Sequence, residues 1–119
     1  MRLFILCTIF IPLTSLATVC ENFTGTTIKS ELCFDTKISG WISKHCLTNK
    51  KCDARKFFLK KIKITPPTPV GGQNPAASYC HELRLPVVVL RDVDGNEQSM
   101  CQFKDKSLLD SNAIERFLE

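Results

Sequence analysis

Cysteine constrains this chain more than any other residue type, because seven cysteines occur in 119 residues. Cys7 lies in an apolar N-terminal run, and the other six are spread between Cys20 and Cys101. An even number of cysteines in a short exported chain is typical of a disulfide framework, since a chain of this size buries only a modest core. Six cysteines permit 15 connectivities. We therefore expect disulfides among Cys20, Cys33, Cys46, Cys52, Cys80 and Cys101.

Residues 1–17 have the organisation of a secretory signal peptide. A positive charge precedes an apolar run from Leu3 to Leu13, which is too short to span a bilayer, and small residues lead up to Ala17. We expect cleavage after Ala17 and a secreted or periplasmic mature chain. Two alternatives are less favoured: an uncleaved N-terminal anchor, and a lipoprotein acylated at Cys20, whose signal would need a small residue in place of Val19.

Charge is unevenly distributed along the rest of the chain. Residues 18–64, a basic cysteine-containing region, carry ten Lys or Arg against four Asp or Glu, whereas residues 74–119 carry five against eight. The positive charge is concentrated in Lys50–Lys63, where Asp53 is placed to cap a helix. One face of that helix is apolar (Ala54, Phe57, Phe58 and Ile62), and the other faces carry Arg55, Lys56, Lys60, Lys61 and Lys63.

A basic amphipathic segment of this kind has two interpretations. It can bind an anionic membrane surface or an acidic envelope polymer through its charged residues. Alternatively, its apolar stripe packs on the core of its own protein beneath a solvated lysine face. We favour packing for the apolar stripe, and keep anionic-surface binding as the hypothesis for the five basic residues.

Residues 74–119 predict a helix, a β-hairpin and a second helix. Asn74 is suited to cap the first helix and Pro75 to its first position. Two β-branched or alternating runs, 86–91 and 97–103, flank a tight-turn signal at Asp94-Gly95. This arrangement brings the first helix near the returning strand. It therefore favours a Cys80–Cys101 disulfide and leaves the other four cysteines to pair within the N-terminal region.

Three shorter segments complete the prediction. Residues 65–73, which contain three prolines and two glycines, are typical of a linker. Residues 112–118 predict a closing helix with Asn112 and Glu115 placed as a capping box. The apolar residues of 38–42 have a short helical spacing, and Trp41 among them is expected to lie in the core.

Patterns for catalysis and for metal binding are poor. His45, Cys46, Cys52 and the Cys80-His81 pair include no CxxC spacing, and an oxidising compartment favours disulfides over zinc thiolates. The acidic run 92–96 has glycine at its fourth position rather than the sixth position that a calcium loop requires, so it predicts a turn. We predict no catalytic residue, no metal site, no cofactor and no nucleic-acid partner.

NPAASYC at 74–80 and CQF at 101–103, with Asp105 following, resemble a family of small secreted bacterial proteins. That family carries a hemolysin label and a hemolysin-like domain of unknown function, and the resemblance covers residues 74–117. It implies a bacterial exported protein with a shared helix, hairpin and cysteine pair.

The sequence as a whole predicts a small exported α+β protein in two disulfide-braced parts, 18–64 and 74–119. Its predicted function is non-catalytic binding or association with the envelope, and the partner would be an anionic membrane surface or an envelope component. A membrane-active, hemolysin-like protein is the alternative.

Overall fold

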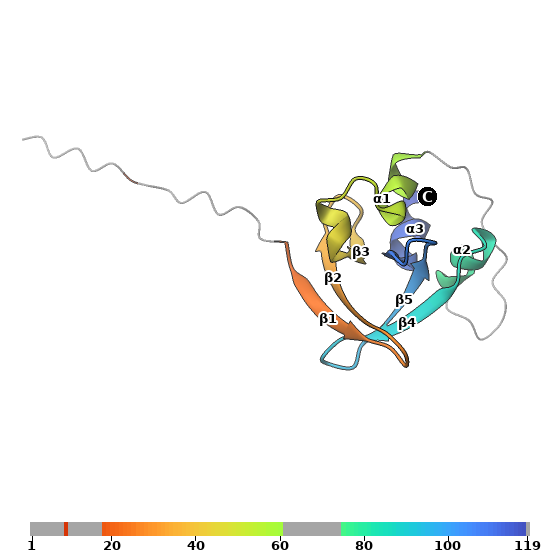
Figure 1. Cartoon of the computed structure of the whole chain (residues 1–119), viewed down its shortest axis with the longest axis horizontal. Coiled ribbons are helices and arrows are strands. Elements are labelled where there is room, and N and C mark those ends of the chain that lie inside the picture. The colour runs from red at the N-terminus through yellow and green to blue at the C-terminus, as the bar shows by residue number, and fades with distance from the viewer. Residues whose placement is uncertain (1–8, 10–17, 61–74, 119) are drawn as a thin grey trace, which may run out of the picture.

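A computed structural model describes residues 18–60 and 75–118, together with Ile9 (Figure 1). Apart from Ile9, the expected signal peptide at 1–17 lies outside the described residues, as does the linker at 65–73. So do Asn74, Lys61, Ile62 and Lys63.

The strands of the described residues form one closed antiparallel barrel with the order β1-β2-β3-β6-β5-β4. The first three strands form a meander, as do the last three, and β4 returns to lie beside β1 in the manner of a Greek key. The strands are β1 Cys20–Thr24, β2 Lys29–Asp35, β3 Gly40–Ser43, β4 Val87–Arg91, β5 Glu97–Gln102 and β6 Leu108–Asp110.

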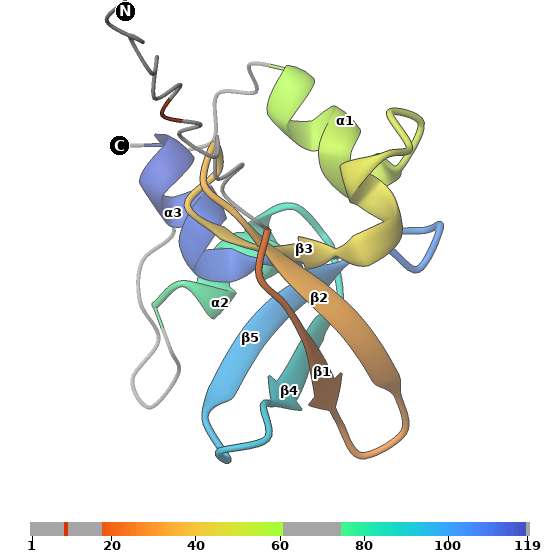
Figure 2. The same cartoon turned by 90° about the vertical axis from the view of Figure 1, so that its left-hand side faces the viewer.

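Helices gather at one end of the barrel, and the β1–β2 and β4–β5 turns project from the other end (Figures 1 and 2). The helical segments in the described residues are η1 Lys44–Leu47, α1 Asp53–Leu59, α2 Ala77–Glu82 and α3 Ser111–Leu118. The fold therefore mixes helix and sheet, as expected, but the sheet is its larger part.

The predicted helix, hairpin and closing helix of the C-terminal region are present as α2, β4–β5 and α3. Gly95 occupies the hairpin turn with a φ of 85°, a left-handed conformation that glycine adopts without strain. The two cysteine-containing regions do not form separate sheets, because β1 pairs with β4 and β3 pairs with β6. Both regions contribute strands to one barrel.

The helical spacing at 38–42 gave a wrong prediction, because Gly40–Ser43 is strand β3. The strand places neighbouring side chains on opposite faces of the sheet. Trp41 packs against the ring of Phe23 at 5.0 Å, next to the barrel interior, whereas Ile42 packs beneath the helices. Trp41 was expected in the core and is partly buried, packing against the cluster of the barrel interior.

Buried side chains form two clusters, one on each face of the sheet. The barrel interior holds one cluster: Phe23, Leu32, Leu90, Met100 and Leu108. The other cluster lies between the barrel and the helices and includes Ile42, Phe57, Leu109, Ile114 and the cysteines Cys46, Cys52, Cys80 and Cys101. Burial on both faces explains why adjacent strand residues, such as Met100 and Cys101, are both fully buried.

The six cysteines of the described residues form three disulfides. Cys20–Cys33 joins a cross-strand pair of β1 and β2, Cys46–Cys52 joins η1 to the start of α1, and Cys80–Cys101 joins α2 to β5. The Cys80–Cys101 pair and the confinement of the other four cysteines to the N-terminal region confirm the prediction. Three disulfides indicate an oxidising compartment, extracellular or periplasmic.

In the part of the chain that the structure describes, no helix has the length and apolar character needed to cross a membrane.

Asp110 fixes α3 to β3. Its Oδ1 accepts a hydrogen bond from the Asn112 N–H at 3.0 Å, and its Oδ2 accepts one from the Trp41 N–H at 3.3 Å. Asp110, rather than the predicted Asn112, is thus the residue whose side chain caps this helix. Burial raises the pKa of Asp110, although the two hydrogen bonds and the charge of Arg116 act in the opposite direction. Gly40 permits α3 to pack closely against the start of β3, since a Cβ at position 40 would lie 2.6 Å from the Cβ of Ala113.

Candidate functional site

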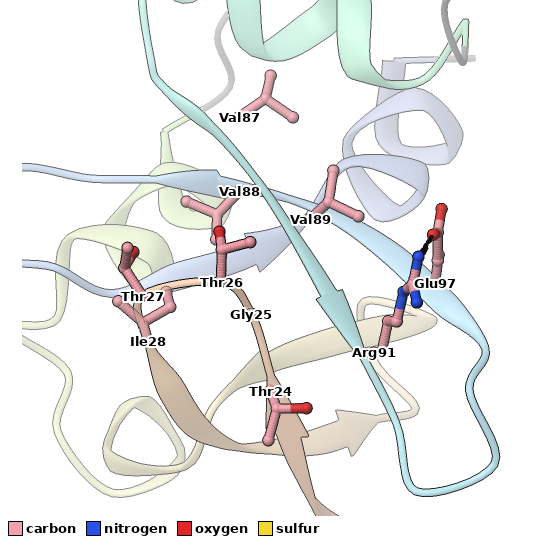
Figure 3. A pocket seen from close by; sticks show the side chains of 10 residues that line it. All are labelled: Thr24, Gly25, Thr26, Thr27, Ile28, Val87, Val88, Val89, Arg91 and Glu97. Atoms are coloured by element: carbon pink, nitrogen blue, oxygen red, sulfur yellow. Dashed lines mark hydrogen bonds and ion pairs between the residues drawn. The ribbon is translucent and has the colours of Figure 1, made fainter.

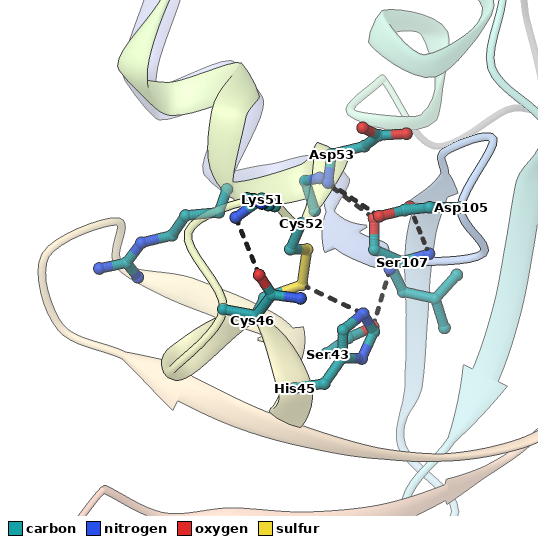
Figure 4. Close-up of a disulfide and its surroundings, with 12 residues drawn as sticks. Ser43, His45, Cys46, Lys51, Cys52, Asp53, Asp105 and Ser107 are labelled. Atoms are coloured by element: carbon teal, nitrogen blue, oxygen red, sulfur yellow. Dashed lines mark hydrogen bonds between the residues drawn. A yellow bond between two sulfur atoms is a disulfide. The ribbon is translucent and has the colours of Figure 1, made fainter.

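The start of α1 is held by side chains from the loop between β5 and β6 (Figure 4). The Asp53 N–H donates to Asp105 Oδ2 at 2.9 Å, and the Ala54 N–H donates to Ser107 Oγ at 3.1 Å. These partners are 52 and 53 positions away in the sequence. Asp53 was predicted to cap the helix itself, but it is the first helical residue and follows Cys52 at the N-cap. Side chains from the C-terminal region therefore orient α1, the helix that carries Arg55 and Lys56.

Asp105→Ala should lower the free energy of unfolding at neutral pH by about 1 kcal/mol, the usual cost of losing a helix cap. Burial raises the pKa of Asp105, but hydrogen bonds from Asp53 and Ser107 and the charge of His45 outweigh it, so the net pKa lies below the ordinary 3.8. A lowered folded-state pKa gives stability that is present above the unfolded pKa and lost as pH falls through the folded one. Urea titrations should show that the free energies of unfolding of the variant and the parent approach each other as the pH falls below about 4. A difference that is constant down to acid pH would contradict this role.

The apolar side of α1 packs on the protein's own core. Ala54 is fully buried and Phe57 is 5% exposed. Phe58 lies edge-on to the ring of Phe57 at 5.6 Å and to the ring of Phe117 at 5.2 Å. The described part of the apolar stripe, Ala54, Phe57 and Phe58, is therefore part of the fold rather than a free surface.

The predicted basic residues are not equivalent. Lys56 and Lys60 are exposed, whereas Arg55 is half-buried and its Nη1 lies 2.9 Å from Asp35 Oδ2. Lys61 and Lys63 lie outside the described residues. Arg55 also lines a cavity between elements that are distant in sequence.

This cavity, here called the basic pocket, has a volume of about 390 Å³. Its lining residues come from the β2–β3 turn, α1 and α3. Helices α1 and α3 lie at the helical end of the barrel (Figure 1). Ser39 in the turn has a φ of 52°, and its carbonyl accepts a hydrogen bond from the Arg116 guanidinium, 77 positions away. The lining residues are Lys37, Ile38, Ser39, Arg55, Phe58, Arg116 and Phe117.

The basic pocket carries a net positive charge. The charge of Arg55 is matched by Asp35, but within residues 18–60 and 75–118 no carboxylate lies within 4 Å of the charged groups of Lys37 or Arg116. The rings of Phe58 and Phe117 provide an apolar wall beside these charges, and Phe117 is 40% exposed. Such a site is suited to bind an anionic group attached to an apolar body.

Sequence reasoning missed Lys37 and Arg116 as site residues. Each is an isolated basic residue, and no local pattern in the sequence distinguishes either one. They come together because Arg116 is carried by α3, which packs closely against the start of β3.

The residues considered for metal binding have other roles. His45, Cys46 and Cys52 offer ligand atoms within 4.8 Å of one another. However, the two sulfurs are joined in a disulfide, and His45 Nε2 lies 3.7 Å from Cys46 Sγ (Figure 4). Cys80 is likewise bonded to Cys101. Disulfide sulfurs are not thiolates, so these cysteines are not zinc ligands in the oxidised protein.

No protein-family model, curated protein or solved structure matches this chain.

Proposed function

We propose that this protein is an exported, non-catalytic binding module that takes an anionic, partly apolar ligand in the basic pocket. The observation that carries the proposal is the combination of two cations that have no ion pair within 4 Å among the described residues, Lys37 and Arg116, with the aromatic wall of Phe58 and Phe117. The ligand would belong to an anionic membrane surface or to an acidic component of the envelope.

Electrostatic and apolar interactions with a ligand would act together in this pocket. A guanidinium can form two parallel hydrogen bonds to a phosphate or carboxylate, and an ammonium adds a compact point charge. Arg55 is restrained by its ion pair with Asp35, which favours a prearranged geometry. The exposed Lys56 and Lys60 extend the positive potential over the neighbouring surface of α1.

Three further features support an envelope location. The disulfides require an oxidising compartment. Residues 1–17 have the pattern of a signal peptide. Residues 74–117 resemble the hemolysin-labelled family of secreted bacterial proteins, and we propose membership of that family as the origin of the C-terminal motifs.

A membrane-active protein is the competing function. The burial of Phe57 weighs against it, because the apolar side of α1 cannot enter a bilayer while it packs on the core. Among the large exposed apolar side chains of the described residues, Val19 and Phe34 lie next to each other, whereas Val89, Val93 and Phe117 lie on other elements.

Lys37→Gln/Arg116→Gln is expected to weaken binding to anionic vesicles or to a soluble polyanion. A basic residue near an anionic membrane contributes about 1 kcal/mol, so losing two should reduce affinity roughly 30-fold. The measurement is co-sedimentation with phosphatidylglycerol-containing vesicles at low and at physiological salt, since screening should weaken binding by the parent.

Lys29→Gln/Lys104→Gln is the matched control, because it removes the same charge from exposed positions outside the pocket. Equal losses in the two double variants would show that only net charge matters and would defeat the proposal. The proposal would also fail if the parent protein bound neither the anionic vesicles nor the soluble polyanion at low salt. Release of an entrapped dye by the parent would instead favour the membrane-active alternative.

A further inference from the structure

The barrel closes between β1 and β4 over one residue pair, Thr24 with Arg91. By contrast, β4 pairs with β5 along its whole length, from Val87 with Cys101 to Arg91 with Glu97. Most of the β4 edge that faces β1 therefore has no partner strand.

The hydrogen-bond pattern shows which groups lie on this edge. The Pro86 carbonyl accepts from the Gln102 N–H, and the Asp92 N–H donates to the Asn96 carbonyl, so the even-numbered residues of β4 direct their backbone groups to β5. By alternation, Val87 and Val89 direct theirs toward β1. Among the described residues, β1 and β4 pair at Thr24 with Arg91 only, so neither valine has a strand partner on that side.

An open groove of about 720 Å³ lies along this edge (Figure 3). Its other wall is the β1–β2 turn, which is closed by a hydrogen bond from the Gly25 N–H to the Ile28 carbonyl at 2.7 Å. The turn approaches β4 closely at Gly25, where a Cβ would lie 2.9 Å from Leu90 Cδ2 and 3.3 Å from the Val89 carbonyl oxygen. The Val89 N–H and both backbone groups of Val87 are then the groups open to an occupant.

Charge and spacing define the kind of occupant. The charged residues of the groove, Arg91 and Glu97, pair with each other at 2.7 Å, so the groove has no net charge to attract an ion. Unpaired groups on residues i and i+2 match the repeat of an extended chain, which is the geometry of strand addition. Val89 is 48% exposed and offers an apolar contact beside these groups.

We propose that the groove between the β1–β2 turn and β4 binds an uncharged, extended peptide segment by strand addition to the Val87–Val89 edge. This site shares no lining residue with the basic pocket and does not depend on the function proposed for it.

Amide hydrogen exchange measured by NMR tests the proposal directly. In the free protein, the N–H groups of Val87 and Val89 should exchange at least about tenfold faster than those of Val88 and Leu90, which serve the β5 pairing. A saturating concentration of the probe acetyl-Thr-Val-Thr-Val-Thr-amide should slow exchange at Val87 and Val89 about tenfold and leave Val88 and Leu90 unchanged. The same peptide N-methylated at alternate residues should give no protection.

A chain variant provides an independent measurement. Val89→Pro removes one of the open N–H groups without removing a β4–β5 hydrogen bond, and should lower affinity for the probe about tenfold or more. Val93→Ser, at a position that is 82% exposed in the hairpin turn, is the matched control and should bind normally. If Val89→Pro does not fold, the comparison of the two peptides still decides the matter.

Three results would overturn the proposal. Val87 and Val89 could exchange as slowly as Val88 in the free protein, which would show that the edge is already paired. The N-methylated peptide could protect as well as its parent. Protection could also appear with rising protein concentration alone, which would assign the edge to a second copy of this chain.

Discussion

Replacing both Cys80 and Cys101 by Ser should lower the free energy of unfolding by about 3 kcal/mol, within the usual range of 2 to 5 kcal/mol for a native disulfide in a small secreted domain. The bridge closes a loop with a sequence separation of 21 and joins α2 to β5, and both cysteines are fully buried. Urea denaturation monitored by the fluorescence of Trp41 gives the measurement.

The loss should appear as one cooperative transition, because β4 and β6 pair with β1 and β3 of the N-terminal region. Peptide mapping without reductant should find the Cys20–Cys33 and Cys46–Cys52 bridges intact in the variant and no free thiol in the parent. A parent in which Cys80 is bonded to any other cysteine would refute the fold described above. Two separate transitions would refute the single barrel.

Phe57→Ala should lower the free energy of unfolding by about 3 to 5 kcal/mol, the typical effect of truncating a buried phenylalanine. Phe57 is 5% exposed and its ring contacts Phe58, Phe103 and Phe117. The variant leaves a cavity between α1 and the barrel, and the midpoint of urea denaturation should fall with it.

Lys56→Ala is the matched control, since this neighbouring residue is exposed on the same helix, and its effect should stay within about 0.5 kcal/mol. Suppose instead that Phe57→Ala leaves stability unchanged and abolishes vesicle binding. The apolar side of α1 would then be a membrane-inserting surface, and the membrane-active alternative would be favoured over the binding module.

Local signals predicted the C-terminal region well. The Asp94-Gly95 turn lies between two strand-like runs, and the left-handed φ of Gly95 is the conformation that such a turn requires. The Cys80–Cys101 pair followed from that hairpin. These features depend on residues that are close in sequence, which is why pattern reasoning could find them.

The N-terminal strands were not predicted, because their signal is hidden by the two-sided core. In β2 the adjacent residues Leu32 and Cys33 are both buried, so polar and apolar residues do not alternate along the strand. The Cys20–Cys33 bridge depends on the register of β1 and β2, which the sequence leaves open.

Of the residues that line the basic pocket, only Arg55 was among the basic residues singled out from the sequence, for a related reason. Arg55 belonged to a visible run of basic residues, but Lys37 and Arg116 meet only after α3 has packed on β3. A contact between residues so far apart in sequence has no local signature.

An NMR titration with dodecyl phosphate below its micellar concentration tests whether the basic pocket binds an anionic amphiphile. We expect saturable shifts at the amides of Lys37–Ser39, Phe58, Arg116 and Phe117, abolished by Lys37→Gln/Arg116→Gln and absent with dodecyltrimethylammonium. Equal shifts with both amphiphiles, or shifts confined to Lys56 and Lys60, would contradict it.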